Sequence, residues 1–157
     1  MYINHNDGWM EVICGSMFAG KTEELIRRVK RLNYANKRCL VFRPRIDNRY
    51  SDTEVVSHSN FRLEAIIIDR AHDAIKHIEE AKKTGKIDAV AFDEAQFFDH
   101  ELVDLAEKLA KDGIRVILAG LDTDFRGEVF GIMGGTGYQN RTFIICILTN
   151  QTERTKF

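Results

Sequence analysis

Residues 10–29 read Met10-Glu-Val-Ile-Cys-Gly-Ser-Met-Phe-Ala-Gly-Lys-Thr-Glu-Glu-Leu-Ile-Arg-Arg-Val29, and this segment indicates the fold of the whole chain. An apolar run enters a loop bounded by Gly15 and Gly20, and an amphipathic helix follows from about Lys21. The two glycines leave room for backbone N–H groups to close around phosphate oxygens, and the helix start adds the positive end of its dipole. The order of strand, loop and helix therefore predicts a P-loop that binds nucleotide phosphates.

Two side chains carry the specific chemistry of this loop. Lys21 is expected to reach the β- and γ-phosphates of ATP, and Thr22 to place its hydroxyl on Mg²⁺, which prefers oxygen ligands. The residues predicted here to bind ATP are Gly15, Ser16, Met17, Phe18, Ala19, Gly20, Lys21 and Thr22.

Composition narrows the class of protein. A chain of 157 residues with 44% hydrophobic and 30% charged residues predicts one globular domain. The net charge of −1 and the lack of a basic stripe argue against a nucleic-acid polymer as partner. No leader or membrane-length apolar run is visible, so we expect a cytoplasmic protein without membrane contact. Three cysteines make no disulfide framework.

Strands alternate with helices along the chain outward from the P-loop. Short apolar runs at 39–42, 63–68, 87–92 and 114–119 read as strands, with helices from about Ala71 and from Asp99, the expected cap, to Lys111. Residues 51–62 are polar and irregular and are predicted to form a loop. The alternation predicts an α/β fold, a mainly parallel sheet with helices on both faces, and a ligand site at the carboxyl ends of the strands.

The strand at 87–92 ends in two acids. Asp93 is predicted to hold Mg²⁺ opposite the P-loop, directly or through water. Glu94 is the candidate catalytic base that receives the proton of a phosphoryl acceptor; the alternative is the water-activating glutamate of an ATPase. Adjacent residues leaving a strand point in different directions, so the two acids need not share a role.

Aromatic and basic residues near the strand ends leave alternatives open. Phe97, Phe98, Phe125 and Phe130 are either core residues or rings that stack on a base, and their position on the crevice side favours stacking for some of them. Arg49 and Arg126 are phosphate contacts or partners in surface ion pairs, since a planar guanidinium suits both.

Four motifs in this order make the chain resemble the thymidine kinases of the cellular and bacterial type, from about Gly8 to Met133. They are Gly15-Ser-Met-Phe-Ala-Gly-Lys-Thr22, Asp47-Asn-Arg-Tyr50, Phe92-Asp-Glu-Ala-Gln-Phe-Phe98 and Gly120-Leu-Asp-Thr-Asp-Phe-Arg-Gly-Glu128. The resemblance implies a RecA-like P-loop core, usually tetrameric, that transfers the ATP γ-phosphoryl group to the 5′-hydroxyl of thymidine or deoxyuridine with Mg²⁺, in nucleotide salvage. It makes Glu94 the catalytic base and Asp93 the residue that serves the metal. Asp93, Gln96 and Arg49 are also predicted to bind ATP. The expected nucleoside-binding residues are Met17, Phe97, Leu121, Phe125, Arg126 and Phe130.

The tail departs from this family. Its members have a proline where Gly134 stands, followed by a zinc subdomain with two cysteine pairs and a lasso loop that holds the thymine edge. Cys146 stands alone here, so no zinc site is expected, and we divide the chain into a kinase core at 1–133 and a divergent tail at 134–157, disordered or forming one added strand. The tail resembles the product of a frameshift. Two alternatives therefore stay open: a nucleotide-binding remnant without kinase activity, and a P-loop ATPase of another class.

Overall fold

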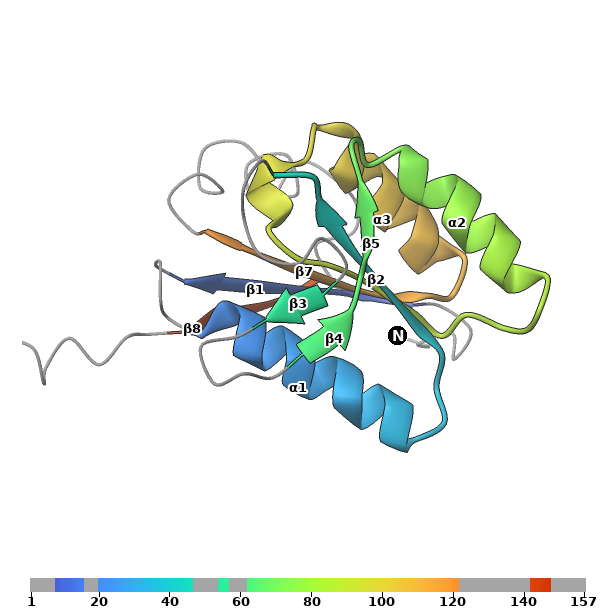
Figure 1. Ribbon diagram of the computed structural model, residues 1–157, viewed down its shortest axis with the longest axis horizontal. Coiled ribbons are helices and arrows are strands. Elements are labelled where there is room, and N and C mark those ends of the chain that lie inside the picture. Colours follow the sequence, from blue (N-terminus) through green and yellow to red (C-terminus); the bar gives the residue numbers. More distant parts are fainter. Residues whose placement is uncertain (1–7, 16–19, 47–53, 57–61, 122–141, 148–157) are drawn as a thin grey trace, which may run out of the picture.

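A computed structural model describes residues 8–15, 20–46, 54–56, 62–121 and 142–147 (Figure 1). In these ranges the helices are α1 (Lys21–Tyr34), α2 (Asp73–Lys82), the short 3₁₀ turn η1 (Ala95–Phe97) and α3 (Glu101–Lys111). The strands are β1 (Met10–Gly15), β2 (Cys39–Pro44), β3 (Glu54–Val56), β4 (Arg62–Glu64), β5 (Ile66–Ile68), β6 (Ala89–Phe92), β7 (Arg115–Leu121) and β8 (Thr142–Ile147). Among the described helices, none combines the length and apolar character needed to span a membrane.

The main sheet has six strands in the order β5-β2-β6-β7-β1-β8, and each neighbouring pair is parallel. β1, which leads into the P-loop, lies between β7 and β8, with Ile13 opposite both Ala119 and Ile145. The predicted α/β fold with a mainly parallel sheet is confirmed. The tail strand β8 forms the edge of the sheet beside β1 (Figure 1).

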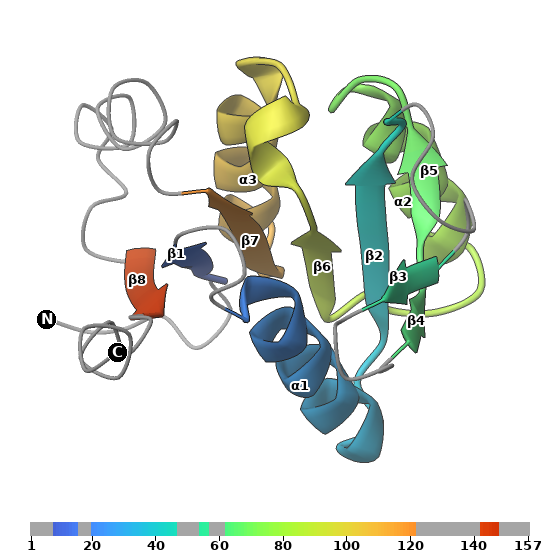
Figure 2. The same ribbon diagram turned by 60° about the vertical axis from the view of Figure 1, so that its left-hand side comes forward.

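Helices cover both faces of this sheet (Figure 2). On one face, Leu25, Ile26 and Val29 of α1 pack on Ile13 and Ile117. On the other face, α2 and α3 pack on a larger apolar cluster that includes β1, β2, β6 and β7. Successive strand residues alternate between the two clusters, because side chains of a strand point to opposite faces. Each central strand is therefore buried on both sides, as parallel strands require.

The predicted single strand at 63–68 is wrong in one respect, because the chain changes partner in the middle of it. β4 pairs antiparallel with β3, and β5 pairs parallel with β2; the break falls at the buried residue Ala65. Leu63 packs toward the α1 side, whereas Ile66 and Ile68 pack toward α2 and α3. Part of the loop expected at 51–62 is thus the strand β3.

The predicted cap of α3 is also wrong. Asp99 Oδ1 accepts a hydrogen bond from the backbone N–H of Ala71 at 3.3 Å, which links the entries to α2 and α3. His100 occupies the cap position of α3 and makes no side-chain capping bond. The other end follows expectation: α3 ends at Lys111, and Gly113 adopts a φ of 90°, a conformation that glycine reaches at little cost.

Candidate active site

The start of α1 forms the described part of the P-loop. Gly20 precedes the helix with a φ of 93°, and its carbonyl accepts the N–H of Glu24 at 3.0 Å. Lys21 Nζ donates to the carbonyl of Gly15 at 2.9 Å, so the lysine bridges the two ends of the loop. Thr22 lies in the first helical turn, half-buried. Ser16, Met17, Phe18 and Ala19 lie outside the described residues.

Asp93 lies directly beyond the end of β6 and is 6% exposed. Its backbone N–H donates to the carbonyl of Phe42 at 2.9 Å, which fixes it beside the end of β2. Burial raises the pKa of the Asp93 carboxyl to about 7, and the neighbouring Glu94 adds to the rise. A hydrogen bond from the backbone of Glu94 and the cations Arg43 and Lys21 act in the opposite direction on this pKa. The P-loop lysine and Asp93 therefore lie within electrostatic reach of each other.

Glu94 has an unusual backbone conformation. Its φ of 50° and ψ of 43° place it in the left-handed region, which residues other than glycine rarely adopt. The side chain is half-buried, and its Oε2 accepts a hydrogen bond from Gln96 Nε2 at 2.7 Å. Asp93 is thus deeply buried while Glu94 remains partly open to solvent, so the two adjacent acids have different surroundings.

Phe97 and Phe98 have different surroundings. Phe98 stacks edge-on against Phe92, with ring centroids 5.7 Å apart, and belongs to the core packing beneath α3. Phe97 is 53% exposed, one of few large apolar side chains at the surface of the described region. The ring of Phe97 is therefore open to solvent, whereas the ring of Phe98 packs partly buried against the core.

Arg43 is a residue that the sequence analysis missed. It lies near the end of β2, is 9% exposed, and acts electrostatically on Asp93. The available signal was a basic residue directly after the apolar run 39–42, on the strand that pairs with β6. The buried Arg43 guanidinium acts to lower the pKa of Asp93, against the effects of burial and of Glu94.

Several predicted site residues fall where the structure gives no account of them. Arg49, Phe125, Arg126 and Phe130 lie outside the described residues. Leu121 is described only as the last residue of β7. The expectation of no zinc site concerns mainly the tail, and it stays a prediction.

The donor set suits magnesium. Thr22 offers a hydroxyl and Asp93 a carboxylate, and Mg²⁺ commonly binds through one or two protein oxygens together with phosphate oxygens and water. Within the described ranges, histidine, cysteine and acidic side chains form no cluster of three or more that could hold a metal alone. The residues therefore fit a metal that arrives with a nucleotide.

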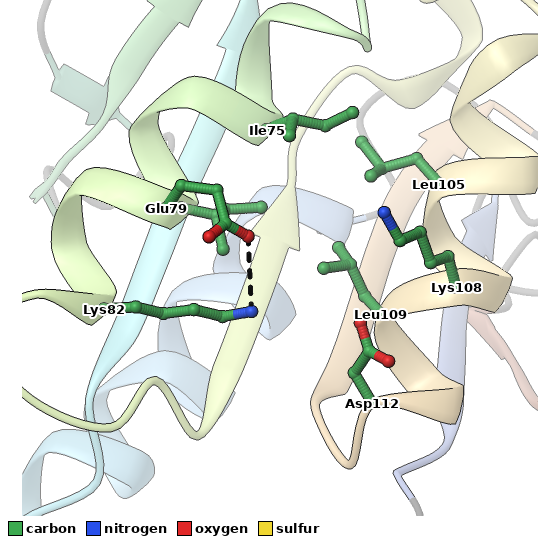
Figure 3. A pocket seen from close by; sticks show the side chains of 8 residues that line it. Ile75, Glu79, Lys82, Leu105, Lys108, Leu109 and Asp112 are labelled. Carbon is green, nitrogen blue, oxygen red and sulfur yellow. Dashed lines mark ion pairs between the residues drawn. The ribbon is translucent and has the colours of Figure 1, made fainter.

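A shallow groove lies away from these residues, between α2 and α3 (Figure 3). Ile75 and Leu105 face each other across it. Charged side chains border it, among them the Glu79–Lys82 ion pair at 3.5 Å. This groove is separate from the site, because α2 and α3 cover the face of the sheet opposite α1.

A parallel sheet flanked by helices on both faces, with a P-loop after β1 and two acids after β6, which is separated from β1 by β7, defines an α/β protein of the P-loop class. The family model of thymidine kinase matches residues 8–134 of the chain. The chain therefore belongs to the thymidine kinase family, and the resemblance seen in the four motifs is confirmed. The match includes β1 to β7 and both acids and ends before β8.

Proposed function

We propose that this chain transfers the γ-phosphoryl group of ATP to the 5′-hydroxyl of thymidine or deoxyuridine. Membership of the thymidine kinase family supports a kinase with a nucleoside substrate. The observation that carries the proposal is the convergence of Lys21, on the P-loop helix, with Asp93 and Glu94 at the end of β6. Phosphoryl transfer requires such a combination of cations, a metal-binding acid and a proton acceptor.

Each group has a distinct proposed task. Lys21 leaves the Gly15 carbonyl and binds the β- and γ-phosphates, and backbone N–H groups of residues 15–22 bind the remaining phosphate oxygens. Thr22 and Asp93 would hold Mg²⁺, which supplies neutralisation of phosphate charge when bound. Gln96 and Arg49 are further proposed nucleotide contacts.

Glu94 is the proposed catalytic base. It accepts the proton of the 5′-hydroxyl as the oxygen bonds to the γ-phosphorus, while the bond from that phosphorus to the β–γ bridging oxygen breaks. The partly open position of Glu94 allows an acceptor to approach, which the burial of Asp93 does not. Phe97 is proposed to stack on the thymine ring, together with Met17, Leu121, Phe125, Arg126 and Phe130.

We extend the proposal to a role in nucleotide salvage in the cytoplasm, as a homotetramer without nucleic-acid or membrane partners. Residues 1–133 form the proposed kinase core, and residues 134–157 the divergent tail. The tail strand β8 pairs with β1 at the edge of the sheet.

The test is transfer of labelled γ-phosphate from ATP to thymidine by the purified chain. Reactions with deoxycytidine and without nucleoside are run beside it, and ATP binding is measured on the same preparation. Thymidine monophosphate formed above both controls supports the proposal. ATP binding without transfer to any nucleoside contradicts it and identifies a nucleotide-binding remnant. ATP hydrolysis stimulated by nucleic acid, without a nucleoside product, indicates an ATPase of another class.

A further inference from the structure

Glu94 has a strained backbone conformation that its own residue type does not favour. Within the described residues, the only residues other than glycine with a positive φ are Asn36 and Glu94. Asparagine enters the left-handed region readily, and Asn36 follows the end of α1, where such turns are common. Glutamate has no such preference, so the conformation of Glu94 is imposed by its surroundings.

Contacts on both sides of Glu94 impose this conformation. Before it, the N–H of Asp93 is bonded to Phe42 at 2.9 Å. After it, the N–H of Phe97 donates to the carbonyl of Glu94 at 3.0 Å, and the N–H of Phe98 to that of Ala95 at 3.1 Å. Ala95 is 2% exposed, so the turn η1 is anchored in the core. The direction in which Glu94 leaves the sheet is thereby fixed by packed structure.

The carboxylate is held as well. Gln96, two residues later on η1, places an amide atom 2.7 Å from Glu94 Oε2. An ionised carboxylate only accepts hydrogen bonds, so the amide must present its N–H₂ group rather than its oxygen. Such a charge-assisted bond is short and directional, and it restricts the rotamers of a side chain that is otherwise half open to solvent.

We propose that Gln96 is a positioning residue for Glu94: its amide holds the carboxylate in the direction needed to receive the acceptor proton. The inference rests on the proposed function, since Glu94 is the proposed base. It goes beyond the expectation that Gln96 contacts ATP. The two roles are separable by experiment, because loss of an ATP contact raises the KM for ATP, whereas misplacement of the base lowers kcat.

The kinetic test uses Gln96→Met, which keeps the length of the side chain and removes its donor. We expect kcat to fall about tenfold to a hundredfold, while KM for thymidine changes less than about threefold, because misplacement of a reacting group affects the transition state most; a rise in the KM for ATP beside this fall reports the separate nucleotide contact. Asn33→Ala, an exposed amide at the end of α1, is the control and keeps the wild-type rate. A rise in the KM for ATP with kcat unchanged would instead make Gln96 a nucleotide contact and overturn the proposal.

A double-variant cycle separates positioning from a general structural effect. In a Glu94→Gln background, adding Gln96→Met should lower the residual rate by less than about twofold, because the base that Gln96 positions is already lost. An equal loss in both backgrounds would show that Gln96 acts independently of Glu94.

A measurement without catalysis keeps the contact testable if the chain transfers no phosphate. The side-chain amide protons of Gln96 should resonate downfield in NMR spectra of the wild type and move upfield in Glu94→Met, which lacks the acceptor. An inactive wild type with this shift contradicts the proposed function and leaves the contact standing. If the wild type is active and the Gln96 resonances are the same in Glu94→Met, this inference is overturned and the proposed function stands.

Discussion

Arg115 of β7 donates two hydrogen bonds to the carboxylate of Glu11 on β1, from Nη2 to Oε1 at 2.9 Å and from Nε to Oε2. Arg28 of α1 donates to the same carboxylate and also, at 2.8 Å, to Glu24 in the first turn of its helix. The Glu11 side chain is 6% exposed, so this cluster lies beneath α1 rather than on the surface. It connects the P-loop helix to the strand that leads into the loop.

Glu11→Gln should lower the free energy of unfolding by about 2–3 kcal/mol. Removing the acid leaves two partly buried guanidinium groups facing each other without the charge that offsets their repulsion. The exposure of the arginine side chains, 22% each, keeps the value below that of a fully buried pair. Urea denaturation measures the change. Glu79→Gln, which breaks an exposed pair, is the control and should cost less than about 0.5 kcal/mol; equal costs for both variants would contradict the prediction.

Gly8→Ala should destabilise the protein by about 3 kcal/mol. The N–H of Gly8 donates to Ala110 at 2.9 Å, and a Cβ added at Gly8 would lie 2.0 Å from the backbone oxygen of Ile114. A backbone atom cannot turn aside as a side chain can, so the strand entry must shift. Gly85→Ala is the comparison: its φ of 152° strains alanine, but the nearest atom is the end of the Arg38 side chain, and about 1 kcal/mol is expected. Thermal denaturation ranks the two, and the reverse order would refute the packing argument.

The thiol of Cys39 should react slowly. It should also make the free energy of unfolding fall at alkaline pH. Burial raises the pKa of Cys39 from 9.0 to about 12, against a smaller opposite effect of Arg115. The folded protein keeps the thiol proton up to about pH 12, whereas the unfolded chain loses it near pH 9.0, so the free energy of unfolding decreases as pH rises across that window. We expect Cys39→Ala to show a shallower decrease between these pH values. Parallel pH profiles of the wild type and the variant would count against the raised pKa.

The parallel sheet, its two layers of helices and the approach of Lys21 to Asp93 near the strand ends could be predicted from the sequence. The signals were local: an apolar run, a glycine-bounded loop, and acids directly after a strand. The pattern of apolar residues could not show that residues 62–68 belong to two different sheets. The change of partner at Ala65 depends on which strand lies beside each half of this segment. Register between distant strands is a tertiary property.

The finer geometry of the site escaped prediction for the same reason. Nothing in Phe92-Asp-Glu-Ala-Gln-Phe-Phe98 signals a left-handed Glu94, since glutamate carries no preference for that conformation. The division of Phe97 from Phe98 and the approach of Arg43 to Asp93 depend on how η1 and β2 pack. The sequence shows the types of these residues but not what surrounds each side chain in the folded protein.

Lys21→Ala should weaken ATP binding at least tenfold while leaving the fold intact. The lysine is the described cation of the P-loop, and its hydrogen bond to Gly15 is one that water can replace at a half-exposed position. Isothermal titration with ATP and Mg²⁺ measures the loss, and circular dichroism checks the fold. Lys30→Ala, which removes a cation from the middle of the same helix, is the matched control and should bind ATP as the wild type does. ATP affinity unchanged in Lys21→Ala would exclude the P-loop role.

Glu94→Gln should lower kcat by at least a hundredfold with ATP affinity preserved. Glutamine keeps the size of the side chain and can still meet Gln96, but it has no basic oxygen to take the 5′-hydroxyl proton. Because the charge removed lies beside Asp93, ATP and Mg²⁺ binding is measured separately by titration, and phosphate transfer to thymidine by rapid quench. Glu64→Gln, an exposed acid on β4, controls for the loss of one negative charge and should retain full transfer. A Glu94→Gln enzyme that transfers phosphate at the wild-type rate would leave the family's reaction without a base at this position and would require another proton acceptor near the end of β6.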